Sequence, residues 1–79
     1  MDTHLFLSTC HNHLITVVPV GAEIYTVWVC KTLGNNKAIF ADSVSNCMYE
    51  YTHNGASSEI YFDQYIKFAN TTIKLEEKQ

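Results

Sequence analysis

Residues 24–42, IYTVWVCKTLGNNKAIFAD, determine the fold predicted for this chain. Two runs rich in β-branched and aromatic residues flank a polar break at residues 34–37, which is the pattern of a β-hairpin. A turn at that break would pair Leu33 with Ala38 and place both side chains on one face. We therefore expect two antiparallel strands here, with the rest of the chain packed against them.

The segment before this hairpin is also rich in β-branched residues. Residues 14–20 read LITVVPV, and Gly21 followed by Ala22 is compatible with a two-residue turn into the hairpin. Pro19 cannot donate a hydrogen bond to a strand ladder, so this strand is expected at the edge of the sheet. Residues 4–8 are expected to form a further short strand. Both faces of the resulting meander are apolar, whereas a lone antiparallel sheet usually keeps one polar face. Either helices cover both faces, or a partner covers one.

Two helices are expected after the hairpin. The first begins at Asp42-Ser43, both of which are good N-caps, carries apolar residues at helical spacing over residues 44–51, and stops at Gly55. The second spans residues 59–69, where an alternation of apolar residues is also compatible with a strand. Residues 71–75 alternate like a last short strand.

The length of 79 residues is that of one small domain, residues 1–79. Together the segments predict an α+β fold, in which a small antiparallel meander of three or four strands carries one or two helices. Charged residues make up 16% of the chain, below the usual quarter or so of a soluble domain. This deficit favours an apolar surface that a partner or a second copy covers.

The charge pattern argues against several classes of protein. The chain has no arginine, its five lysines are scattered, and its net charge is −3. Nucleic-acid-binding proteins usually present a clustered basic face, so direct nucleic-acid binding is not expected. The longest apolar run is too short to span a bilayer, and the N-terminus lacks the pattern of a signal peptide. Three cysteines cannot all pair, so we expect a cytoplasmic protein with reduced thiols and no membrane contact.

The motif that most strongly suggests a metal-binding or catalytic site is Cys10-His11-Asn12-His13. Zinc sites usually combine two pairs of ligands, and here only Cys10 and His13 have usable spacing. A cysteine nucleophile would also need a base held against it, which neighbours on an extended chain rarely provide. The sequence therefore predicts no catalytic residue, no cofactor and no enzyme. A metal or ligand site in the Cys10–His13 loop is the alternative.

The tyrosines indicate where a protein partner would bind. Four of the five are expected to be half-buried, whereas Tyr49 lies on the outer face of the first predicted helix, beside Asn46, Glu50 and His53. An exposed aromatic residue beside charged and polar side chains is typical of a contact surface. We therefore predict that these four residues bind a protein.

Small size, mild acidity and the lack of a catalytic motif are shared with many phage and mobile-element products that inhibit host factors, including anti-restriction and anti-CRISPR proteins. The predicted function is a non-enzymatic protein-binding module that inhibits or modulates a larger host complex. The alternative is a small metal- or ligand-binding domain that uses Cys10 and His13. A homodimer through the uncovered sheet face is compatible with either function.

Overall fold

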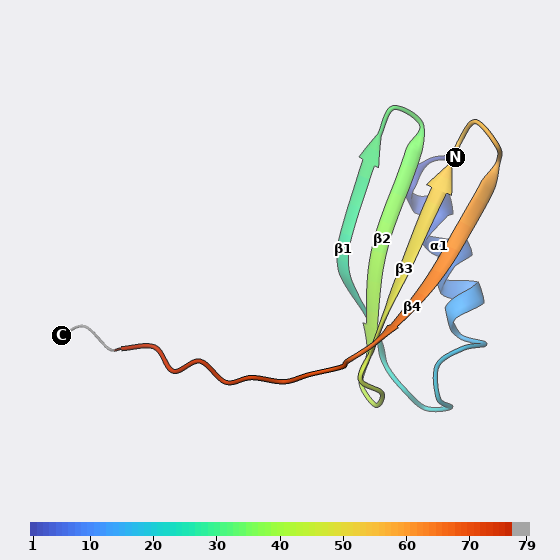
Figure 1. Ribbon diagram of the computed structural model, residues 1–79. Helices are drawn as coiled ribbons and strands as arrows, with labels where there is room; N and C mark the ends of the chain where they lie inside the picture. Colours follow the sequence, from blue (N-terminus) through green and yellow to red (C-terminus); the bar gives the residue numbers. More distant parts are fainter. Residues whose placement is uncertain (77–79) are drawn as a thin grey trace.

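The computed structural model describes residues 1–76, which form one helix and one sheet. In chain order the elements are α1 (Thr3–Leu14), β1 (Ile24–Thr32), β2 (Asn35–Asp42), β3 (Cys47–Asn54) and β4 (Glu59–Ile66). All neighbouring strands are antiparallel, and their order in the sheet is the order in the chain. Figure 1 shows α1 behind this four-stranded meander. An α+β fold with a small antiparallel meander was predicted, and this architecture agrees with it.

The helix α1 occupies residues for which a strand and a loop were predicted. Asp2 caps it, because the Asp2 carboxylate accepts a hydrogen bond of 2.8 Å from the amide of Leu5. Phe6, Cys10 and Leu14 follow at intervals of four and are at most 1% exposed, so they form one buried face. The prediction of a strand at residues 4–8 and a loop at Cys10–His13 was wrong, because it overlooked this spacing.

The strand predicted at residues 14–20 is also absent from the structure. The chain leaves α1 through tight turns, in which the amides of Val17 and Val18 both donate to the carbonyl of Leu14. Val17 and Val18 are partly buried against the core, whereas Val20 is fully exposed. The β-branched residues here therefore pack as a turn around the end of the helix.

The β1–β2 hairpin was predicted correctly, but in the wrong register. Its turn is Leu33-Gly34, where both residues have a positive φ (41° and 88°), as a two-residue hairpin turn of the I′ kind requires. Ala38 therefore pairs with Val29, and not with Leu33 as predicted. A bulge lies in β1 between Thr26 and Trp28.

The two helices predicted after the hairpin are strands β3 and β4. Asp42 does cap the amides that follow it, but it closes a turn: its carboxylate accepts from the amides of Val44 and Ser45 at 2.8 and 2.7 Å. Exposure along β3 then alternates with a period of two, as does that of the first residues of β4. The strand alternative for the second segment was the correct one.

The predicted strand at residues 71–75 has no regular structure. Residues 67–76, here called the C-terminal arm, leave the end of β4 and run away from the sheet (Figure 1). The amide of Lys67 donates to the carbonyl of Asn46 at 2.9 Å, and the residues after it are exposed. Phe68, Ile73 and Leu75 present their apolar side chains to solvent.

The core lies between α1 and one face of the sheet. Its buried members are Phe6, Cys10, Leu14, Ala38, Phe40, Tyr49 and Tyr51. Aromatic rings meet edge to face within it, as between Phe40 and Tyr51, whose centroids are 5.7 Å apart. Within residues 1–76, no helix is long and apolar enough to cross a membrane.

Candidate functional site

The sheet has one covered and one uncovered face. The helix α1 packs on the face that carries Phe40, Tyr49 and Tyr51. Within residues 1–76 no helix or strand lies over the opposite face, which is turned toward the viewer in Figure 1. We call this opposite surface the open face.

The strand register defines the open face as three rows of side chains. The rows are Tyr25-Ala41-Met48-Tyr65, Trp28-Ile39-Glu50-Asp63 and Cys30-Lys37-Thr52-Tyr61. Because paired residues point to the same side, each row crosses the sheet from β1 to β4. The aromatic side chains therefore stand at the two margins, on β1 and β4.

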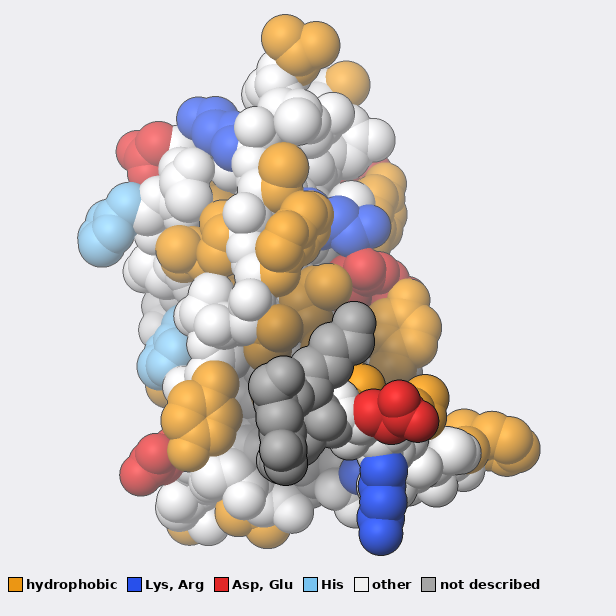
Figure 2. Space-filling view, turned by 90° about the vertical axis from the view of Figure 1, so that its left-hand side faces the viewer, with side chains coloured by type: hydrophobic (Ala, Val, Ile, Leu, Met, Phe, Trp, Pro, Cys, Tyr) orange, Lys and Arg blue, Asp and Glu red, His pale blue; other side chains and the backbone are white. Residues whose placement is uncertain are grey.

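These marginal side chains are unusually exposed for their size. Tyr25, Trp28, Tyr61 and Tyr65 are 45–54% exposed, and Met48 is 41% exposed. Figure 2, which views the molecule from its β1 side, shows hydrophobic side chains spread over its whole height, with charged side chains between them. Several exposed aromatic residues on one face are typical of a surface that binds another molecule.

Charged groups occupy the middle of the open face. The Lys37 ammonium lies 3.4 Å from the Glu50 carboxylate, and the Tyr65 hydroxyl donates to the same carboxylate at 3.2 Å. This hydrogen bond raises the pKa of Tyr65, so its hydroxyl stays a neutral donor at pH 7. The open face thus combines apolar rings at its margins with charged and polar groups in its middle.

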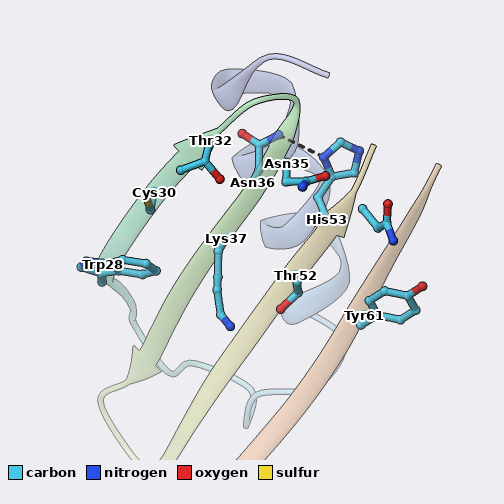
Figure 3. Close-up of a pocket in the computed structure, with 10 residues that line it drawn as sticks. Trp28, Cys30, Thr32, Asn35, Asn36, Lys37, Thr52, His53 and Tyr61 are labelled. Carbon is cyan, nitrogen blue, oxygen red and sulfur yellow. Dashed lines mark hydrogen bonds between the residues drawn. The ribbon is translucent and has the colours of Figure 1, made fainter. Parts of the chain in front are cut away.

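Two hollows lie on this side of the molecule. The larger one, about 420 Å³ in volume, lies between Trp28 and Tyr61, with Lys37 and Thr52 between them (Figure 3). Asn54 is among the residues at its hairpin end. The second, about 390 Å³, lies at the opposite end, beside Met48, Tyr65 and the base of the C-terminal arm.

A cluster of polar groups at the β2–β3 turn has a structural role. The Ser45 hydroxyl and the Tyr49 hydroxyl both donate to the Asp42 carboxylate. These bonds, with the backbone amide of Ser45, hold the pKa of Asp42 well below its usual range. Burial and the Asp42 carboxylate raise the pKa of Tyr49. The cluster therefore holds an ionised carboxylate that closes the turn.

Cys10 and His13, the predicted alternative for a metal or ligand, lie one turn apart on α1. Cys10 is 1% exposed, and burial raises the pKa of its thiol to about 12, so the thiolate that a metal would need is disfavoured. His13 instead makes a hydrogen bond of 2.7 Å through Nδ1 to the Tyr51 hydroxyl. Both residues line a hollow of about 190 Å³ against β3 and β4. Within residues 1–76, no three His, Cys, Asp or Glu side chains are placed to hold a metal ion together.

The structure separates the four residues predicted to bind a protein. Tyr49 and His53 face α1 and are 1% and 5% exposed, so their predicted place on an outer helix face was wrong. Asn46 is exposed in the β2–β3 turn, and Glu50 lies on the open face. The error has one cause: a period of two places alternate residues of this segment together, whereas the predicted helix grouped residues three and four apart.

Trp28, Tyr61 and Tyr65 were not predicted as site residues. A signal for the first of them is present in the sequence, because a hairpin with two apolar faces must leave one face for another molecule unless helices cover both. Trp28 and Ile39 lie side by side on the open face, across β1 and β2. Tyr61 and Tyr65 were missed because β4 was assigned to a helix.

Comparisons with known proteins give a family but no function. One family model, described as a family of unknown function (DUF6275), matches residues 6–75. No significant match is found among curated proteins or among solved structures. The matched range extends through all four strands and into the C-terminal arm as far as Leu75.

Proposed function

We propose that this chain, which belongs to the DUF6275 family of unknown function, is a small non-enzymatic protein-binding module. It binds a larger macromolecular complex of a host through the open face of its sheet and thereby inhibits or modulates that complex. The partner is a protein, and nucleic acid and membrane are not bound directly. The protein works in the cytoplasm of that host.

The observation that carries this proposal is the unpartnered open face. Its four marginal aromatic side chains are about half exposed although the sheet has a well-packed core on its other side. Leaving such rings in water is unfavourable by roughly 25 cal/mol for each Å² of apolar surface, so a partner that covers them gains that free energy. Tyrosine and tryptophan are also the side chains that most often dominate protein interfaces.

The polar centre of the open face favours a protein surface over a purely apolar ligand. Lys37, Glu50 and Asp63 carry both signs of charge within one patch, and the two hollows adjoin it. A partner that meets this patch needs complementary charges at matching positions, which a folded protein surface supplies. The net charge of −3 favours partners with a basic surface.

The groups that could act in catalysis have other roles in this fold. Cys10 is a buried neutral thiol, His13 bonds to Tyr51, and Asp42 closes a turn. These roles support a binding function. The metal-binding alternative at Cys10 and His13 is the weaker hypothesis, because the Cys10 thiol is neutral and buried.

The experiment compares variants of the two faces of the molecule. The full chain, Trp28→Ala and Tyr61→Ala are used to capture partners from a lysate of the natural host cells, and captured proteins are quantified by mass spectrometry. Leu5→Ala is the matched control, because Leu5 is 52% exposed on the outer side of α1. We expect the parent and Leu5→Ala to capture one stoichiometric partner complex. Trp28→Ala and Tyr61→Ala should each capture at most about one tenth of that amount.

The activity of the captured complex is then measured with the parent protein and with Trp28→Ala added. Inhibition by the parent and none by the variant would support the modulator role. Equal capture by all four proteins would place the interface elsewhere, and the absence of any stoichiometric partner would contradict the proposal.

A further inference from the structure

The two edge strands of the sheet differ in how they are protected. The free edge of β1 is interrupted by the bulge between Thr26 and Trp28, a common device against further strand pairing. By contrast, β4 pairs with β3 in an unbroken register from Glu59 to Ile66. Its other side is a regular edge of eight residues, which is a template for one more strand.

The C-terminal arm has the properties of a strand that lacks its neighbour. It continues directly from β4, and within residues 67–75 the side chains of Phe68, Ile73 and Leu75 are 81–101% exposed. The family match includes the arm as far as Leu75, so most of the arm lies in the region that the family model describes. An apolar extended segment gains free energy only when another surface covers it.

The arm cannot cover the β4 edge of its own sheet along its full length. To do so the chain would have to reverse directly after Ile66, but Lys67, Phe68 and Ala69 include none of the residues that favour tight turns. Asn70 is the first such residue, and a turn there would leave only residues 71–75 to pair. In the structure the arm continues away from the sheet (Figure 1).

We propose that the arm pairs with β4 of a second copy of this chain, so that two copies exchange arms in a symmetric dimer. In the symmetric register, residue 67 of one copy faces residue 67 of the other, and residues 68–75 run antiparallel to residues 59–66. Each four-stranded sheet thereby gains a fifth strand from the other copy, by the mode of strand addition that peptide ligands use.

The side chains match in this register. Ile73 of the arm lies beside Tyr61, and Phe68 lies beside Ile66, which is itself 74% exposed in the single chain. The two segments also carry opposite net charge, because the arm through Leu75 has two lysines and no acid, whereas β4 has Glu59 and Asp63 and no base. Pairing therefore covers apolar side chains of both copies.

The exchanged arm also completes the open face. Because Tyr61 lies on that face, Ile73 and Leu75 of the second copy extend its β4 margin with apolar side chains. The inference does not depend on the proposed function, since it rests on the strand edge and the arm. Its tests measure the mass and the covalent linkage of the isolated protein, so they can fail independently of any partner.

The first test is the mass of the full chain in solution by sedimentation equilibrium at micromolar concentrations. We expect twice the 9.0 kDa of one chain. Ile73→Asp is expected to shift the protein to monomers, whereas Val20→Asp, the same kind of change at a fully exposed loop position, is expected to leave the dimer intact. A monomeric parent, or a dimer that Ile73→Asp does not weaken, overturns the proposal.

The second test decides which copy supplies the arm. The double variant Tyr61→Cys with Ile73→Cys is oxidised, with the parent treated in parallel to account for its own thiols. Exchange predicts a disulfide between the two copies, seen as a covalent dimer on a non-reducing gel. A disulfide within one chain would show that the arm folds back on its own sheet, and no new disulfide would show that residues 61 and 73 do not meet; either result overturns the exchange.

Discussion

Nδ1 of His13 lies 2.7 Å from the hydroxyl of Tyr51, in a contact that ties the last turns of α1 to the middle of β3. The two residues are 38 positions apart, and their rings meet edge to face with centroids 5.7 Å apart. Tyr51 is otherwise surrounded by apolar side chains, and burial raises the pKa of its hydroxyl. The contact therefore satisfies a polar group within the core.

Removing the Tyr51 hydroxyl tests how much the contact with His13 contributes to the stability of the fold. Tyr51→Phe keeps the ring and removes the hydrogen bond, so we expect a loss of about 1 kcal/mol in the free energy of unfolding. Tyr65→Phe is the matched control, because its hydroxyl bonds to Glu50 on an exposed surface, and its loss is expected to stay within about 0.5 kcal/mol. Urea unfolding followed by circular dichroism measures both. Equal losses would show that the His13 contact contributes nothing specific.

The buried face of α1 is tested by Phe6→Ala. Phe6 is 0% exposed, so its truncation leaves a cavity between helix and sheet, and we expect a loss of about 3–5 kcal/mol. Leu5→Ala, at the neighbouring and half-exposed position, is expected to change stability by less than about 0.5 kcal/mol. Similar effects of the two changes, measured by thermal or urea unfolding, would mean that α1 does not pack as described.

The lowered pKa of Asp42 predicts that the stability of the folded protein depends on pH. Hydrogen bonds lower the pKa of its carboxyl in the folded protein below the ordinary value of 3.8, so the folded state favours the ionised form. The resulting stabilisation is complete above pH 3.8 and is lost as the pH falls toward the lowered value. Asp42→Asn should therefore be less stable than the parent at pH 7, with a smaller difference at pH 2–3.

The control for this measurement is Asp63→Asn, which removes the same charge from an exposed position of β4. Its effect on the unfolding free energy should be small at both pH values. If the difference between the parent and Asp42→Asn is the same at pH 7 and below pH 3, the carboxylate does not hold the turn in its ionised form.

The three cysteines should differ in reactivity. Burial raises the pKa of Cys10 to about 12, so at pH 8 its thiol is protonated and enclosed, whereas Cys30 and Cys47 are partly exposed. Brief treatment of the folded protein with iodoacetamide should label Cys30 and Cys47 and leave Cys10 unmodified, as peptide mass spectrometry can show. All three should react in urea. Rapid labelling of Cys10 in the folded protein would contradict its burial.

The sequence predicts the fold class and the central hairpin but only part of the element pattern. The hairpin was predictable because alternation and a turn signal occur together in residues 24–42. The register was not, because the turn consists of Leu33 and Gly34, so only the first residue of the polar break at 34–37 is in the turn and the other three belong to β2. Leucine is an uncommon residue at a positive φ, so its place in the turn gave no signal.

The missed strands and the missed helix have different physical reasons. Residues 47–54 have apolar side chains at both helical and alternating positions, so local pattern does not choose between the two. Pairing with a neighbouring strand decides that this segment is a strand, because β2 forms a continuous antiparallel ladder with it that includes Tyr49 and Tyr51. At the N-terminus, His, Ser and Thr residues obscured the four-residue spacing of Phe6, Cys10 and Leu14.

The placement of α1 constrains the order in which the molecule can assemble. A helix of 12 residues is marginally stable on its own in water, and its buried face packs on residues that follow much later in the chain. The four strands, in contrast, pair only with their neighbours in sequence, a topology with short loops and low entropic cost of closure. The meander should thus form first during folding, and the segment synthesised earliest should become ordered last, when β2 and β3 present the surface on which α1 docks.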